Sequence, residues 1–369
     1  MPSDHAAKPD PAVAERPAGV PAGFEAVEVC DLCGSSETVE LVAETPARCR
    51  TVLCRQCGLM FASPRMSEER LRDFYDDEFT GDPGSAARLA IAPQESERLQ
   101  RDDRLAVKWA LPLVKRHLDP KGATILDLRC RTGALSSALA REGARVLSVD
   151  PFKDSLDLAR DARGLSDLFL VPVTGFETLA LPEAEGVDAV VALNVHVLAH
   201  LRSPRRWLRR MHELLRPGGH LILDEKDVLL PVNQRGSSVF DSGQAHNYHL
   251  TLTTLRKYAL DAGFELVECG IDPYRRTAFR HMVLVARKPA QPGQAAAPGK
   301  ADAGAALRNP ADAAAIAARL DRLHRTWALR RLGMRLRREL RQGRLAVVRK
   351  ARALRAGGGL PIFPARPKG

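Results

Sequence analysis

The chain has few aromatic residues and no long uninterrupted apolar stretch. Phe, Trp and Tyr make up 5% of its 369 residues, and no stretch approaches the roughly 18 apolar residues that a membrane-spanning helix needs. The amino-terminal segment also lacks the apolar core of a signal peptide. We therefore expect a cytoplasmic protein, in which the seven cysteines are thiols or metal ligands and not disulfides.

Charge is distributed unevenly along the chain. The net charge is +11. From residue 301 onward, 17 Lys and Arg stand against 4 Asp and Glu, which gives +13, so the first 300 residues sum to −2. The basicity therefore belongs to the carboxyl-terminal tail and indicates nothing about a substrate of the remainder.

Two neighbouring segments have the pattern of strands that end in aspartate. Thr124 to Gly133 reads TILDLRCRTG, in which an apolar run ends in Asp127 and a turn carrying Gly133 leads into a helical stretch. Arg145 to Pro151 reads RVLSVDP, a second apolar run that ends in Asp150. Nucleotides bind where such parallel strands end and turn into helices. Asp150 is placed there to accept ribose hydroxyls.

Apolar runs and helical patterns alternate through the central part of the chain, which predicts a doubly wound α/β fold with a mostly parallel sheet. Five further strands are expected at 168–171, 187–193, 220–224, 264–269 and 281–286. Helices are expected at 99–118, 134–142, 154–162, 204–215 and 253–262. The last two strands are too close for a helical crossover, so we expect an antiparallel hairpin that completes a seven-stranded sheet.

Composition divides the chain into six parts. They are a leader (1–23), a cysteine-containing module (24–80), the α/β body (86–288), a Pro/Ala-rich linker (289–312), a basic amphipathic helical tail (313–356) and a terminal segment (357–369).

Four cysteines occur as two Cys-x-x-Cys pairs. Cys30 and Cys33 form the first pair, and Cys54 and Cys57 the second, twenty residues further on. Four thiolates in two such knuckles suit a tetrahedral zinc ion, and a site closed by four sulfurs leaves no position for water. We therefore expect a structural zinc that stabilises a module too small to fold by its core alone.

The motifs of the body, taken together, resemble the class I S-adenosylmethionine (SAM) methyltransferases, whose first loop reads Asp-x-Gly-x-Gly-x-Gly. VDAVVALNVHVLAHL resembles the family's fourth strand, LLRPGGHLIL its Pro-Gly-Gly entry to the fifth, and HNYHLTLTTLRKYALDAGFELVE its His-x-x-His segment and following helix. The resemblance spans about residues 105–286. CRQCGLMFASPRMSEERLRDFYDDEF is similar to the zinc-binding leader of certain sugar C-methyltransferases. The carboxyl-terminal domain of those enzymes is not found here, so sugar C-methylation is not carried over.

The resemblance implies SAM as cofactor and a set of residues that hold it. These are Asp127, Arg129, Cys130, Arg131, Gly133, Asp150, Phe176, Glu177 and Asn194. Two arginines stand where the family has glycine. If either adopts a left-handed backbone, the strain is on the order of 1–2 kcal/mol, and we hypothesise that Arg129 either turns outward or pairs with the cofactor's carboxylate.

Two other functions remain open at this stage. The arginines favour a degenerate methyltransferase fold that acts as a binding or scaffold subunit, whereas the retained Asp127, Gly133, Asp150 and Pro-Gly-Gly favour an enzyme. A nicotinamide-dependent oxidoreductase is the least favoured of the three functions, because no Gly-x-Gly-x-x-Gly spacing follows the first strand.

Polar residues expected at the strand ends are candidates for chemistry. His196 and His200 follow the fourth strand, and Asp224 stands at the tip of the fifth. The catalytic candidates are His200, His246 and His249, and a histidine of segment 226–250 is favoured as the base that takes the acceptor's proton. Each of the three can instead be structural. The long polar segment 226–250 is predicted to cover a small-molecule or glycan acceptor. The basic tail is predicted to contact an anionic membrane surface, at its inner face, or a protein partner; nucleic acid is less favoured.

Overall fold

The computed structural model describes residues 20–42, 50–75, 93–193, 196–230, 246–272, 281–291 and 307–323. The chain forms two compact units, Met1–Ala317 and Ala318–Gly369. The architecture below is that of the first unit; in the second, the described residues 318–323 are helical. Most of the predicted linker and tail, and the predicted site residue Asn194, lie outside the described residues.

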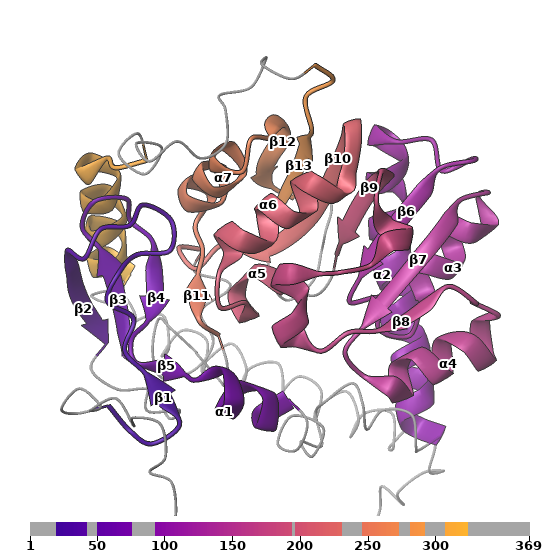
Figure 1. Cartoon of the computed structure of the whole chain (residues 1–369), viewed down its shortest axis with the longest axis horizontal. Coiled ribbons are helices and arrows are strands. Elements are labelled where there is room, and N and C mark those ends of the chain that lie inside the picture. Colours follow the sequence, from indigo (N-terminus) through magenta and orange to yellow (C-terminus); the bar gives the residue numbers. More distant parts are fainter. Residues whose placement is uncertain are drawn as a thin grey trace, which may run out of the picture. The chain divides into compact units, whose positions relative to one another are not determined.

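A seven-stranded sheet forms the centre of the first unit (Figure 1). Its order is β12-β13-β10-β9-β6-β7-β8. The strands are β6 (Thr124–Leu128), β7 (Arg145–Asp150), β8 (Leu168–Leu170), β9 (Val187–Ala192), β10 (Leu215–Lys226), β12 (Glu265–Ile271) and β13 (His281–Arg287). β13 is antiparallel to both neighbours, whereas the pairs from β10 to β8 are parallel. The predicted mostly parallel sheet and its closing antiparallel hairpin are confirmed.

Helices cover both faces of this sheet. Successive strand residues point to opposite faces, so both faces carry apolar side chains that helices cover. Ile125 packs with α2 (Pro93–His117) and α3 (Ala134–Arg141), while Leu126 belongs to the core beneath α6 (Pro204–Leu214) and α7 (Leu252–Asp261) (Figure 1). The other helical segments of the body are α4 (Lys153–Arg163), α5 (Val197–His200), η3 (Val173–Thr178) and η4 (Pro182–Ala184). The described helices include none with the length and apolarity to cross a membrane.

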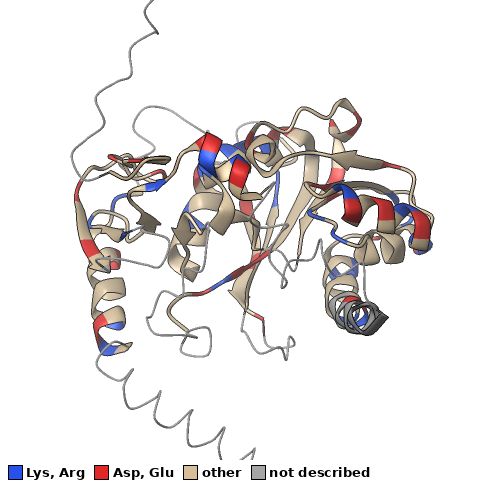
Figure 2. Cartoon of the chain, turned by 90° about the horizontal axis from the view of Figure 1, so that it is seen from below, with Lys and Arg blue, Asp and Glu red and all other residues tan. Residues whose placement is uncertain are grey.

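Charged residues lie mainly on the helices and loops of the body, where both signs are interspersed (Figure 2). Some form exposed pairs within one helix, such as Lys153 with Asp157 on α4. Such pairs contribute little to stability, typically a few tenths of a kcal/mol. The body therefore depends on its buried apolar strands.

The amino-terminal module has a four-stranded antiparallel sheet, and one of its strands comes from the body. The module supplies β2 (Thr38–Val42), β3 (Thr51–Cys54) and β4 (Met60–Ala62). The fourth strand, β11 (Tyr248–His249), pairs with β4 at the edge of this sheet. A short ribbon of β1 (Phe24–Glu25) and β5 (Arg65–Met66) precedes α1 (Glu68–Asp73), which Ser67 caps. The segment predicted to cover the acceptor is thus anchored in the cysteine module.

A buried carboxylate joins the module to the body. Asp31, inside the first cysteine pair, accepts hydrogen bonds from Ser203 Oγ at 2.5 Å, from the Arg205 amide at 3.1 Å and from Tyr258 Oη at 2.9 Å. Burial raises the pKa of Asp31, and these three donors oppose that shift. Arg65 adds a second link by donating to the Arg202 carbonyl at 2.5 Å.

The end of the predicted linker and the start of the predicted tail contact the module and the body. A helical stretch begins at residue 310, and the amide of Asn309 donates to the Gln56 carbonyl. Asp312 pairs with Lys257 of α7 at 2.8 Å. Gly58 leaves room for Ile316, whose Cδ1 would lie 2.5 Å from a Cβ at that position. The end of the predicted linker and the start of the predicted tail therefore pack as part of the first unit.

We expect Asp31→Ala to lower the free energy of unfolding by about 3–5 kcal/mol, because it leaves buried donors without their acceptor. Urea unfolding followed by circular dichroism measures the change. Glu183→Ala, at an exposed carboxylate in η4, is the control and should stay within about 0.5 kcal/mol of the parent. A similarly small effect for Asp31→Ala would contradict its role as the contact that joins the module to the body.

Candidate active site

The loop after β6 keeps the backbone of a glycine-rich turn although it contains two arginines. Arg129, Arg131 and Gly133 have φ of 56°, 54° and 69°, so every second residue is left-handed. Glycine adopts this region without penalty, and other residues do so at a cost. Gly133 is also required for packing, because a Cβ there would lie 2.8 Å from that of Ala159.

Asp150, at the tip of β7, holds two loops at the carboxyl edge of the sheet. Its carboxylate accepts the Arg131 amide at 2.9 Å and the Phe152 amide at 3.0 Å. Burial raises the pKa of Asp150, and the nearby Arg129 guanidinium is the first of several groups that oppose the shift. The aspartate predicted to bind ribose thus also fixes the first loop.

The side chains of Asp127, on β6, and Cys130, in the loop, are both buried. Asp127 is buried and accepts a hydrogen bond from Ser136 Oγ, on α3, at 2.6 Å. Burial, with a smaller contribution from Asp150, raises its pKa to about 7. The Cys130 thiol is buried, which raises its pKa and favours a packing role over that of a nucleophile.

The side chain of Arg129 lies near the tip of β7 at this edge. Its Cζ lies 5.9 Å from the centre of the Phe152 ring, and its charge acts on Asp150, Tyr75 and His200. Its Nε is buried and has no hydrogen-bond partner among the described residues. An unsatisfied buried donor beside the loop fits an anionic group of a bound ligand.

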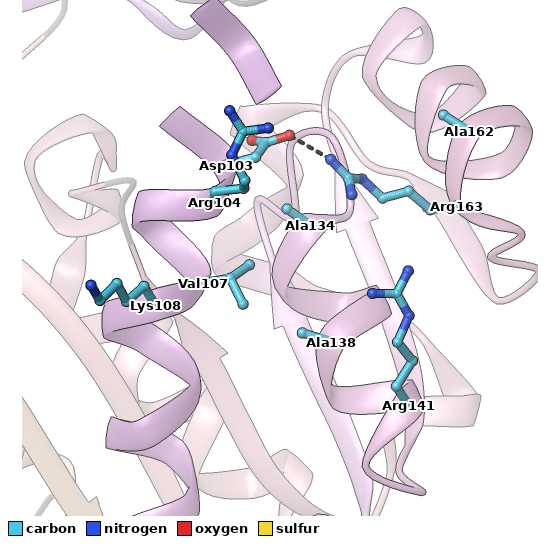
Figure 3. Close-up of a pocket in the computed structure, with 9 residues that line it drawn as sticks. All are labelled: Asp103, Arg104, Val107, Lys108, Ala134, Ala138, Arg141, Ala162 and Arg163. Atoms are coloured by element: carbon cyan, nitrogen blue, oxygen red, sulfur yellow. Dashed lines mark hydrogen bonds and ion pairs between the residues drawn. The ribbon is translucent and has the colours of Figure 1, made fainter. Parts of the chain in front are cut away.

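A buried network supports the outer side of the loop. Arg163 Nη2 donates to Asp103 of α2 at 2.5 Å (Figure 3). Thr132 Oγ1 donates to the same carboxylate at 2.7 Å, and Arg163 Nε donates to the Thr132 carbonyl at 2.7 Å. These contacts lie beside a pocket of about 580 Å³ between α2, α3 and α4. Its lining residues are Asp103, Arg104, Val107, Lys108, Ala134, Ala138, Arg141, Ala162 and Arg163. Four cations and one carboxylate make the pocket basic.

Two of the three predicted catalytic histidines lie together. His200 Nδ1 is 2.8 Å from Tyr75 Oη, and the rings of His200 and His246 are 4.6 Å apart, edge to face. Burial lowers the pKa of His200 well below its usual value and that of His246 to about 3, while it raises that of Tyr75 to about 12. All three are therefore neutral near pH 7. His249 lies instead in β11, opposite Met60, and burial lowers its pKa to about 4.

The two residues predicted near the adenine have contacts within the protein. Phe176 is fully buried in the hydrophobic core. Glu177 accepts the amides of Arg202 and Ser203 at 2.5 and 2.9 Å, at the start of α6. Their part in cofactor binding remains a prediction.

The structure also brings together three residues that the sequence interpretation did not combine. His196 follows β9, Asp224 lies near the end of β10, and His281 begins β13. His281 Nδ1 is 2.7 Å from Asp224 Oδ2, and the two imidazole rings stack 4.5 Å apart. His196 and Asp224 were noted at expected strand ends. His281 was missed because it starts an antiparallel strand, which reverses the rule that functional groups follow a strand.

The four paired cysteines converge in the module. Their Sγ atoms lie within 4.8 Å of one another, with 3.5 Å between Cys30 and Cys57 and 3.6 Å between Cys33 and Cys54. The glycine after each pair has a positive φ, and its amide donates to the carbonyl of Cys30 or Cys54, which tightens the knuckle. Four buried sulfurs at this spacing fit a tetrahedral zinc ion.

Comparison with known proteins agrees with the fold. Residues 99–269 match the family model described as a methyltransferase domain. This segment is a class I methyltransferase domain. Together with β13, it forms the mostly parallel sheet with a closing antiparallel hairpin that the sequence motifs had implied.

Relatives with curated names match about a third of the chain. The ubiquinone biosynthesis O-methyltransferase of Xanthomonas axonopodis pv. citri (strain 306) is 36% identical over 115 residues, 31% of this chain and 47% of that protein. The tRNA U34 carboxymethyltransferase of Pseudoalteromonas translucida (strain TAC 125) is 33% identical over 138 residues, 34% of this chain and 41% of that protein. The chain thus spans less than half the length of these relatives.

Among solved structures, one similar chain is the 1,6-didemethyltoxoflavin-N1-methyltransferase of Burkholderia thailandensis, solved with its substrate and S-adenosylhomocysteine. It is 20% identical, with a TM-score of 0.44, and the match covers 63% of this chain and 96% of that one.

We expect Arg131→Gly to stabilise the methyltransferase domain by about 1 kcal/mol, because it removes left-handed strain and keeps the amide that donates to Asp150. Urea unfolding measures this. Arg131→Ala is the matched control, since it removes the same side chain but keeps the strained backbone. Equal stability of the two variants would show that the positive φ carries no cost.

Proposed function

We propose that the protein transfers a methyl group from SAM to an oxygen, nitrogen or carbon of a small-molecule or glycan acceptor. The observation that carries the proposal is the left-handed loop of Arg129 to Gly133, held by Asp150 inside a methyltransferase domain. When bound, SAM supplies an electrophilic methyl group on a sulfonium. The protein's own task is to bind and orient both reactants.

On the cofactor side, each proposed contact uses a group already at the edge of the sheet. Asp150 has lone pairs beyond the two that accept amides, so it can also accept ribose hydroxyls. We propose that Arg129 Nε, buried and without a described partner, donates to the carboxylate of the cofactor. Gly133 and the Asp127 loop hold the methionine end.

On the acceptor side, we propose that His200, His246 and Tyr75 orient the acceptor through neutral hydrogen bonds. A pKa of about 3 makes His246 a poor proton acceptor at neutral pH, because a general base works best when its pKa is near the working pH. His246 is thus better suited to accept a hydrogen bond from an acceptor hydroxyl or amine. Segment 226–250 covers the acceptor, and residues 231–245 of it lie outside the described part.

The cysteine module is proposed to hold a structural zinc ion, which fixes the sheet to which β11 belongs. The relative named for tRNA raises nucleic acid as another acceptor. The first 300 residues carry a net charge of −2, which disfavours a polyanionic substrate on the body. We therefore retain the small-molecule or glycan acceptor and propose that the basic tail contacts an anionic membrane surface or a protein partner.

The second candidate is a scaffold that no longer binds SAM. One observation favours it: the Arg129 guanidinium lies near both Phe152 and Asp150, within the volume where an adenosine would bind. Isothermal titration of SAM against the full chain separates the two functions. Binding to the parent supports the enzyme, whereas binding only after Arg129→Gly would show that the side chain blocks the site.

If Arg129 contacts the cofactor carboxylate, Arg129→Ala should weaken SAM binding roughly 10- to 100-fold, the value of one lost hydrogen bond to a charged group. Titration calorimetry gives the dissociation constant. Arg104→Ala, an exposed arginine on α2, is the control and should bind as the parent does. Unchanged or tighter binding by Arg129→Ala would refute the contact.

Removing the proposed zinc should disorder the module and, through β11, weaken acceptor binding more than SAM binding. We expect Cys54→Ser to lose one equivalent of zinc by elemental analysis and to lower the melting temperature markedly. Cys269→Ser, a half-buried cysteine of β12 outside the cluster, serves as the control. Full stability of metal-free Cys54→Ser would contradict a structural zinc.

A further inference from the structure

The geometry points to a second metal site, for a divalent first-row transition ion, formed by His196, Asp224 and His281. Each residue offers one ligand atom, and the three atoms lie within 4.8 Å of one another. Among the described residues, this group and the four cysteines are the sets with metal-ligand spacing. The metal site itself does not depend on the proposed function. Only the role of the metal in activating an acceptor rests on that function.

The strand register explains why these three residues meet. Asp224 lies opposite Val283, and His281 lies opposite Lys226, so His281 and Asp224 are diagonal neighbours on one face of the β10–β13 pair. Leu223 lies opposite Ala192 near the end of β9, which brings the turn containing His196 to the same level. The site is therefore built on the rigid carboxyl edge of the sheet, on the side of β9 away from the cofactor loop.

Burial gives the site a closed and an open side. Asp224 is 0% exposed and His281 2%, whereas His196 is partly exposed. Two ligands are thus fully buried and the third lies nearer to solvent, so we infer that the coordination position left open by the protein is on the His196 side. Metal sites that perform chemistry keep three protein ligands and leave such a position open, in contrast to the closed set of four cysteines.

His196 holds its position through an unusual backbone. Its φ and ψ are both 49°, a left-handed conformation at the start of α5 that costs energy for any residue other than glycine. Side chains in this region are found most often where function requires them. Here the conformation places the imidazole of His196 in a stack with that of His281, with 29° between the ring planes.

The donor set selects the class of ion. Two imidazoles and a carboxylate suit Zn²⁺ and the neighbouring divalent ions, not Ca²⁺ or Mg²⁺, which prefer oxygen ligands. His281 Nδ1 lies 2.7 Å from Asp224 Oδ2, so an ion bound by both atoms would take the place of the contact between them. An acceptor hydroxyl bound at the open position would have a lowered pKa, and its proton would pass to solvent.

Cobalt titration of the full-length protein, first loaded with a single equivalent of zinc that the four thiolates bind in preference, tests the site directly. We expect one further equivalent of Co²⁺ to bind, with weak visible bands and without the intense thiolate-to-cobalt absorption that exchange into the cysteine site would produce. His196→Gly should weaken this binding about 100-fold or more, and glycine accommodates the positive φ, so the variant should fold. Asp224→Asn should have a similar effect.

His212→Gln, which changes a histidine of α6 outside the group, is the control and should bind cobalt as the parent does. The inference is overturned if the zinc-loaded parent takes up no cobalt, or if both His196→Gly and Asp224→Asn bind it as the parent does. SAM titration without cobalt is a separate readout. Cobalt binding without SAM binding would remove the proposed function and leave the metal site standing.

Discussion

The carboxylate of Asp150 is the contact on which the cofactor side of the molecule depends. It is buried at the tip of β7 and accepts amides from two different loops. Burying a charge is costly unless hydrogen bonds compensate, and here the compensating donors are backbone groups of the segments that must be positioned. The same interaction therefore stabilises the carboxylate and sets the shape of the crevice. The network of Asp103, Thr132 and Arg163 supports that shape from the outside.

The acceptor side depends on the junction between the module and the body. Asp31 receives three hydrogen bonds from α6, α7 and the residue before α6, and β11 extends the module's sheet. Tyr75, from the end of the module, reaches His200 of the body. The two parts thus share one set of polar contacts, and the residues proposed to orient an acceptor come from both.

Much of the architecture could be predicted from the sequence because it depends on local patterns. Alternating apolar runs predicted the seven strands, and the short spacing before residues 281–286 predicted the antiparallel hairpin. The pairing of β11 with β4 could not be predicted, since two residues carry no periodicity and their partner lies almost 190 residues earlier. The meeting of His196 with His281 likewise depends on strand register, which a single sequence does not specify. The cysteine cluster was predictable because its ligands come in local pairs.

The loop after β6 shows which property of glycine such loops require. Arg129 and Arg131 adopt the torsion angles that glycine usually supplies at such positions, so the chemical requirement is a backbone shape and not a residue type. A pattern that demands three glycines would pass over chains of this kind, even where the amides point correctly. Arginine at these positions also supplies a charged side chain that glycine lacks. Substitution of that side chain can change ligand affinity while the path of the main chain stays the same.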